Sequence, residues 1–157
     1  MTNETSSPRL IVPSLGGFYD GVRDLSYPLI RASLGLWLAP HGAQKLLGWF
    51  GGGGVSGTIQ FFETNLALFP GWFWAVSAGL IELVGGLCLL FGFLTRPVAL
   101  LVVIEMLIAA FYVHLPNGFF WTGGGYEYPL MLTVIALAIL FRGGGRLSVD
   151  SALGQEF

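Results

Sequence analysis

Two long apolar stretches, residues 72–94 and 97–115, constrain the fold of this chain more than any other feature. Each is long enough to cross a bilayer as a helix, which takes about 20 residues. Each also carries one acidic residue near its middle, Glu82 in the first and Glu105 in the second. Only 10% of the whole chain is charged, well under the roughly 25% of a typical soluble domain. The chain is therefore expected to be an integral membrane protein.

Two further segments complete a predicted all-α fold, a bundle of four transmembrane helices. Residues 27–47 are mostly apolar, but they include the polar residues Arg31, His41, Gln44 and Lys45. Residues 126–141 are short for a full crossing, so this helix is expected to tilt or to thin the bilayer locally. The predicted membrane domain spans residues 27–142, between an N-terminal tail (1–26) and a C-terminal tail (143–157). The first tail has no apolar run long enough for a signal peptide, so we expect it to be retained.

The basic residues predict the orientation of these four spans. Lys45 is alone near one side of the membrane, and the other side has Arg9, Arg23, Arg96, Arg142 and Arg146. By the positive-inside rule, both termini face the cytoplasm. In the outer loop between the first two spans, the run Gly51–Gly54 precedes apolar residues at three- and four-residue steps. This spacing predicts a short helix lying on the outer surface.

Composition also excludes several classes of function. The formal net charge is -2, so the chain lacks the basic field that binds nucleic acid, and we expect no nucleic-acid partner. The single cysteine, Cys88, excludes an intramolecular disulfide and a thiolate zinc site. His41 and His114 are too poorly matched in depth and direction to favour a shared haem, and no metal site is expected. Without ligands for flavin, haem or iron–sulfur clusters, electrons would have to come from a partner or from substrate.

The ionisable residues at membrane depth are the most informative ones. Each costs about 2.5 to 3.5 kcal/mol to insert, so such groups usually face the bundle interior or a wet cavity. Glu82 shares its helix face with small residues, so it should point inward. These small residues are Ala75, Ala78, Gly79, Gly85 and Gly86. Two interpretations stay open. Arg31 could pair structurally with Glu82 or Glu105, or one of the carboxyl groups could accept and relay a proton.

A second polar cluster is predicted in the outer third of the helices, where His41, Lys45, His114 and Glu127 are expected. Pro40 cannot donate its backbone hydrogen bond, so the first helix should kink just before His41. Such a kink would form part of a pocket wall.

The combined motifs resemble the DoxX family of small bacterial membrane proteins. The likeness runs from Arg31 and the sequence HGAQKL at 41–46 through the glycines around Glu82, NGFF at 117–120 and GYEYP at 125–129 to Asp150. It implies a four-helix protein of the bacterial cytoplasmic (inner) membrane. It also implies a redox neighbourhood, because a related DoxD-type subunit belongs to a thiosulfate:quinone oxidoreductase.

Three functional hypotheses follow. The first is a membrane subunit of a quinone-linked oxidoreductase, working with other subunits in the lipid bilayer. In it His41, Lys45 and Glu127 bind the quinone head group, and Glu82, Lys45 and His41 handle protons during catalysis. The alternative is a non-catalytic accessory or assembly subunit that packs against a larger membrane complex. A small transporter is disfavoured, because no inverted repeat is visible.

Overall fold

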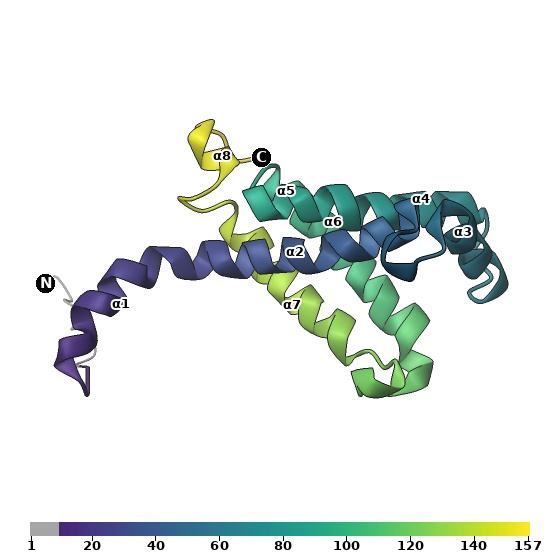
Figure 1. The fold of residues 1–157 in the computed structure, drawn as a ribbon, viewed down its shortest axis with the longest axis horizontal. Coiled ribbons are helices and arrows are strands. Elements are labelled where there is room, and N and C mark those ends of the chain that lie inside the picture. The colour runs from purple at the N-terminus through teal and green to yellow at the C-terminus, as the bar shows by residue number, and fades with distance from the viewer. Residues whose placement is uncertain (1–9) are drawn as a thin grey trace, which may run out of the picture.

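The computed structural model describes residues 10–157, and these residues form helices and loops without any strand. The predicted all-α class is confirmed for this part of the chain (Figure 1). Residues 1–9, which include Arg9 and the start of the expected N-terminal tail, lie outside the described residues.

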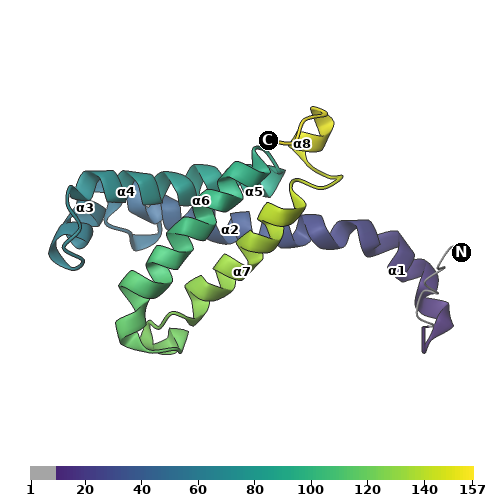
Figure 2. The ribbon, with the colours of Figure 1, turned by 180° about the vertical axis from the view of Figure 1, so that it is seen from behind.

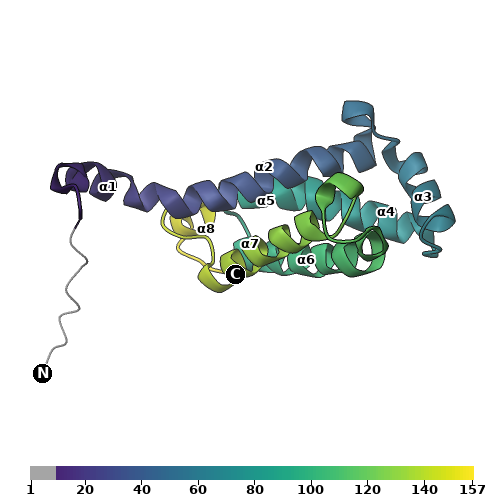
Figure 3. The same cartoon turned by 90° about the horizontal axis from the view of Figure 1, so that it is seen from below.

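Helix α2 (Ser26–Leu47) is the longest element and forms one side of the bundle. The shorter α1 (Gly16–Val22) precedes it, and together they extend beyond the other helices (Figure 3). Helix α2 ends at Gly48, whose φ of 70° lies in the left-handed region that favours glycine. The next helix, α3 (Gly54–Thr64), packs on α2 and α4 and occupies the place where a short helix was predicted.

Two longer helical segments cross the centre of the molecule. The first joins α4 (Gly71–Leu80), a π-helical turn at Ile81–Gly85 and α5 (Gly86–Phe91). The second joins α6 (Thr95–Ile108) to a π-helical segment at Ala109–His114 and ends at Asn117. Among the described residues, these two are the helices long and apolar enough to cross a membrane.

Helix α7 (Glu127–Arg142) packs against α6 as an antiparallel hairpin (Figure 2). Its 16 residues make it shorter than a typical span. The hairpin diverges from α2 and α3 toward its connecting loop (Figure 1). The buried core lies where the helices meet, and it consists of Leu34, Leu38, Leu89, Val98, Ala99, Val102, Val103, Met106, Leu132, Ala136 and Ile139.

Glycines allow α2 to pack very closely against the α4–α5 segment. A Cβ atom on Gly35 would clash with the carbonyl oxygen of Gly86 and lie 2.6 Å from the backbone nitrogen of Leu90. A Cβ atom on Gly42 would lie 2.7 Å from the carbonyl oxygen of Gly79. The small residues near Glu82 therefore form the surface on which α2 rests.

The segment expected to be a C-terminal tail folds back onto the bundle. It contains α8 (Val149–Ala152), and its Asp150 is only 1% exposed. The Asp150 carboxylate accepts hydrogen bonds from the backbone nitrogens of Leu94 (2.8 Å) and Thr95 (3.0 Å), and its own N–H donates to the Gly92 carbonyl (2.9 Å). The carboxylate thus caps the first turn of α6. The sequence did not predict that this segment packs on the bundle, because it has too few apolar residues to indicate a buried position.

Candidate functional site

An ion pair between Lys45 and Glu82 lies at the centre of the candidate site. Lys45 is in the last turn of α2, and Glu82 is the second residue of the π-helical turn. The Lys45 ammonium donates to Glu82 Oε2. Glu82 is only 6% exposed, so this contact provides the partner that a buried carboxylate needs. π-Helical turns are rare and are often found at functional sites.

Glu105 on α6 brings a second carboxyl group to this region. Glu82 and Lys45 are the charged groups that act on it electrostatically. One of its oxygens, Oε2, is buried and has no hydrogen-bond partner within the described part of the chain. A buried polar atom without a partner costs about 1 to 3 kcal/mol and calls for an explanation.

A cavity of about 360 Å³ opens beside these groups, between α3, α4 and α6. Its wall is largely apolar and includes the rings of Phe61, Phe62, Phe73 and Trp74. The ionisable residues that line it are Lys45, Glu105 and His114. We call it the lateral cavity. A mostly apolar pocket with a few convergent polar groups is the usual form of a small-molecule site.

A second pocket, of about 320 Å³, lies between the end of α2, the loop with Gly52 and Gly53, and α3. We call it the outer pocket. Lys45 lines both the outer pocket and the lateral cavity, together with Phe61 and Phe62. The Thr58 hydroxyl fixes α3 in this position, because it lies 3.1 Å from the Lys45 carbonyl oxygen and 2.7 Å from that of Gly54.

The structure does not bring the three predicted quinone-binding residues together. Of His41, Lys45 and Glu127, only Lys45 lines the lateral cavity. His41 is exposed, and Glu127 Oε2 accepts a hydrogen bond from the Trp121 backbone at 3.1 Å. His114 takes part instead. Its Nδ1 lies 2.7 Å from the Gly124 carbonyl oxygen, and because that oxygen can only accept, Nδ1–H donates the hydrogen bond.

Arg31 also differs from its expected role, because its guanidinium meets carbonyl oxygens and not the carboxylates of Glu82 and Glu105. It donates to Leu89 O (2.9 Å), to Leu147 O (2.8 Å) and to Gly144 O. The reason is its position along α2. At about 1.5 Å per residue, Lys45 lies about 21 Å from Arg31, at the opposite end of the helix, and Lys45 is the cation beside Glu82.

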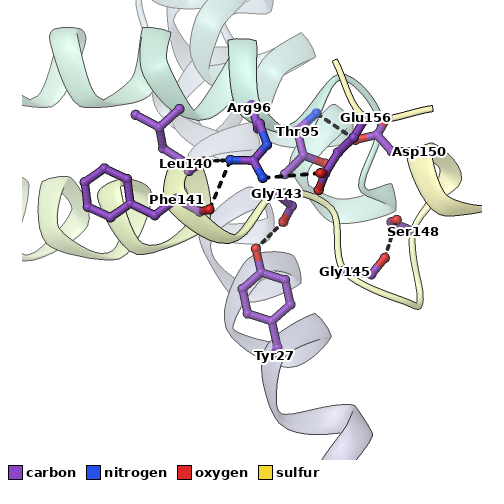
Figure 4. Close-up of polar contacts among 10 residues, drawn as sticks. All are labelled: Tyr27, Thr95, Arg96, Leu140, Phe141, Gly143, Gly145, Ser148, Asp150 and Glu156. Carbon is purple, nitrogen blue, oxygen red and sulfur yellow. Dashed lines mark hydrogen bonds and ion pairs between the residues drawn. The ribbon is translucent and has the colours of Figure 1, made fainter.

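The end of the bundle around Arg31, which we call the Arg31 end, is closed by a polar network (Figure 4). The Tyr27 hydroxyl donates to the Gly143 carbonyl, and the Arg142 guanidinium lies 4.5 Å from the centre of the Tyr27 ring. Arg96 donates to the carbonyls of Leu140 (2.7 Å) and Phe141 (3.0 Å). These contacts are structural, since they tie α2, α6, α7 and the C-terminal segment together.

No group of three His, Cys, Asp or Glu residues within residues 10–157 is arranged to hold a metal ion. The ionisable groups of the candidate site are an ammonium group, two carboxyl groups and an imidazole beside a largely apolar cavity.

Comparison with known proteins identifies the family of the chain. The DoxX family model matches residues 27–115. The chain belongs to the DoxX family. Among relatives of this DoxX protein, an uncharacterised Haemophilus influenzae protein is 35% identical over 106 residues, covering 62% of this chain and 78% of the relative. A Bacillus subtilis protein named "Putative oxidoreductase CatD" is 35% identical over 111 residues, covering 71% and 75%. No solved structure matches the chain. With its apolar helices, this DoxX chain is a membrane protein.

Proposed function

We propose that this DoxX protein is a membrane subunit of a quinone-linked oxidoreductase complex and that the lateral cavity receives the quinone head group. The observation that carries the proposal is the convergence of Lys45, Glu105 and His114 on one largely apolar cavity. The name of the Bacillus relative supports a redox setting. When bound, a quinone supplies the capacity to take up two electrons and two protons.

The residues present fit such a ligand. The volume of about 360 Å³ is within the roughly 300 to 1,000 Å³ typical of small-molecule pockets. The aromatic wall suits an apolar ring, and Glu105 Oε2 has no hydrogen-bond partner among residues 10–157. Lys45 would donate a hydrogen bond to a ligand oxygen, and Glu105 would hold a proton beside it. His41 and Glu127, outside the cavity, have no role in this form of the proposal.

The proposal includes a topology. Helices α2 and α7 cross the membrane together with the α4–α5 and α6 segments, so that residues 27–142 form a four-span domain of the bacterial inner membrane. Both termini then face the cytoplasm, and α3 and the outer pocket face the opposite side. The arginines at the Arg31 end support this orientation, because Arg96, Arg142 and Arg146 are all near that end.

Quinone binding can be measured directly because Trp74 lines the lateral cavity. The purified chain in mild detergent is titrated with a short-chain ubiquinone, and saturable quenching of tryptophan fluorescence is expected. The Trp74→Phe variant should lose most of the quenched signal. Ser77→Phe, which places a ring in the cavity, should abolish saturable binding.

The matched control is Val84→Phe, because Val84 is 49% exposed and does not line the cavity. It should bind quinone like the original chain. Equal binding by Ser77→Phe and Val84→Phe would contradict the cavity as the site. Suppose instead that neither the original chain nor any variant binds quinone, while the chain co-purifies with a larger complex after gentle solubilisation. In that case the accessory hypothesis replaces the catalytic one.

A further inference from the structure

The position of Lys45 between two separate pockets has a consequence for proton movement. The outer pocket is open and partly polar, with Gln44, Thr58 and the backbone of Gly52 and Gly53 in its wall. The lateral cavity is enclosed to a greater degree and mainly apolar. Among the described ionisable residues, Lys45 is the one that lines both.

Two carboxyl groups interact with Lys45. Glu82 is in direct contact with the Lys45 ammonium. Glu105 lines the lateral cavity and interacts electrostatically with both. An isolated carboxylate in an apolar wall is costly unless it is paired or protonated. Glu105, whose buried Oε2 has no hydrogen-bond partner in the part of the chain that the structure describes, is therefore suited to carry a proton.

We propose that protons pass from water in the outer pocket through Lys45 and Glu82 to Glu105, which delivers them to the ligand in the lateral cavity. This inference rests on the proposed function for the identity of the ligand, but the path itself is a property of the chain. It makes Glu105 a catalytic residue that touches the ligand. Lys45 would be its source of protons.

The proton balance is simple. The O–H bond of the Glu105 carboxyl breaks, and the proton goes to a ligand oxygen. The resulting carboxylate regains a proton from the Lys45 ammonium by way of Glu82, and water in the outer pocket returns a proton to the Lys45 amine. No electron moves in these steps. The electrons of quinone reduction come from a two-electron donor on a partner protein.

The path can be tested without turnover, by infrared spectroscopy of the full chain in lipid. A protonated Glu105 gives a carboxylic acid C=O band that Glu105→Gln removes. After transfer to D₂O, this band shifts as the carboxyl proton exchanges. We expect exchange to be about tenfold or more slower in Lys45→Arg, equivalent to about 1.4 kcal/mol in activation free energy. Absence of a Glu105 band in the original chain would overturn the proposal.

Lys45→Arg is the decisive variant because it keeps the positive charge beside Glu82 but does not release its proton. A merely structural role for Lys45 would leave the exchange rate unchanged in this variant, and that result would overturn the path. Retention of thermal stability shows that the variant folds. Lys45→Met, which leaves Glu82 unpaired, serves only to measure the structural contribution of the ion pair.

A second measurement tests the outer pocket as the entrance. Gly57→Cys places a thiol in the wall of that pocket, where a Cβ atom meets nothing within 4 Å. In a Cys88→Ala background, modification with a bulky thiol reagent should slow exchange at Glu105. Thr64→Cys, exposed on α3 and outside the pocket wall, is the control and should leave exchange unchanged. Equal exchange after both modifications would contradict the entrance.

The two proposals can fail independently. If the chain does not bind quinone but exchange at Glu105 still depends on Lys45, the quinone site would be rejected and the proton path would be supported. If quinone binds but the exchange rate is the same in Lys45→Arg, the quinone site would be supported and the proton path would be rejected.

Discussion

At the scale of single residues, Arg31 shows how a buried charge is kept without a carboxylate. It is 3% exposed, and its guanidinium donates to carbonyls of α5 and of the C-terminal segment. The planar guanidinium has five N–H donors in a fixed arrangement, which suits several acceptors at once. Lysine has a single charged nitrogen and cannot reach all three carbonyls.

We predict that Arg31→Lys lowers the free energy of unfolding by about 2 to 4 kcal/mol, because buried carbonyls lose their donors. Thermal unfolding in mild detergent measures the change. Arg146→Lys is the matched control. Its pair with Asp24 is exposed, with 85% and 63% of the two side chains accessible, so little change is expected. Similar losses in both variants would contradict a special role for Arg31.

We predict that Asp150→Ala destabilises the chain by about 1 to 3 kcal/mol, because the Leu94 and Thr95 N–H groups lose their acceptor. Asp150→Asn should lose less, since its side-chain oxygen still accepts one hydrogen bond. Both are followed by thermal unfolding. Asp20→Ala, in an exposed pair with Arg23, should be nearly neutral. An Asp150→Ala variant as stable as Asp20→Ala would refute the capping role.

Within the apolar segments, the sequence predicted which ionisable residues face inward, but not how they pair, and it did not predict the burial of Asp150. Membrane depth alone indicated that Glu82 and Glu105 face inward, because lipid excludes a lone charge. Their partners depend on the rotation of each helix, and the π-helical turn at Ile81–Gly85 changes that rotation by a local widening that has no clear sequence signal. The structure places His41 and Glu127 outside the lateral cavity, and the sequence could not indicate this because depth does not determine direction.

At the scale of elements, the contact between α2 and the α4–α5 segment depends on glycine. Gly35 and Gly86 allow backbone to approach backbone, and no side chain can rotate away to make space. The small-residue pattern on the second helix predicted such a face from sequence. The long apolar helices were also predicted from sequence at residues 72–94 and 97–115, and the structure has apolar helices at Gly71–Phe91 and Thr95–Asn117.

We predict that Gly35→Ala destabilises the chain by about 2 to 4 kcal/mol, because the added Cβ forces two backbones apart. Gly21→Ala in α1 is the control, since a Cβ atom there meets nothing within 4 Å. It should be neutral or stabilising by up to about 1 kcal/mol through helix propensity. Thermal unfolding compares the two. Equal stability would mean that α2 does not pack on α5 as closely as described.

At the scale of the whole molecule, the two ends of the bundle differ in construction. The Arg31 end is held by side chain to backbone hydrogen bonds of Arg31, Tyr27 and Arg96, of which Figure 4 draws those of Tyr27 and Arg96. At the opposite end α6 and α7 diverge from α3 (Figure 1). The lateral cavity and the outer pocket are lined by residues of this end. In the proposed orientation, the Arg31 end faces the cytoplasm, and the end with the lateral cavity and the outer pocket faces outward.

This orientation predicts opposite labelling of two exposed positions in intact cells. In a Cys88→Ala background, Ser56→Cys on α3 should react with a membrane-impermeant thiol reagent from outside. Gln155→Cys, beyond α8, should react only after lysis. Mass spectrometry of the purified chain measures the modification. Reaction of Gln155→Cys in intact cells would reverse the topology inferred from the arginines.

The contacts of Arg31 also impose an order on synthesis. Two of its three carbonyl partners belong to Gly144 and Leu147, which leave the ribosome more than a hundred residues after Arg31 itself. Until then a newly inserted chain holds its most buried cation with only part of its hydrogen bonding. A chain that stops after Arg142 would contain every helix of the bundle and still carry this defect. An unfinished copy that stops there would thus expose unsatisfied guanidinium donors inside the bundle, and the completed chain satisfies them.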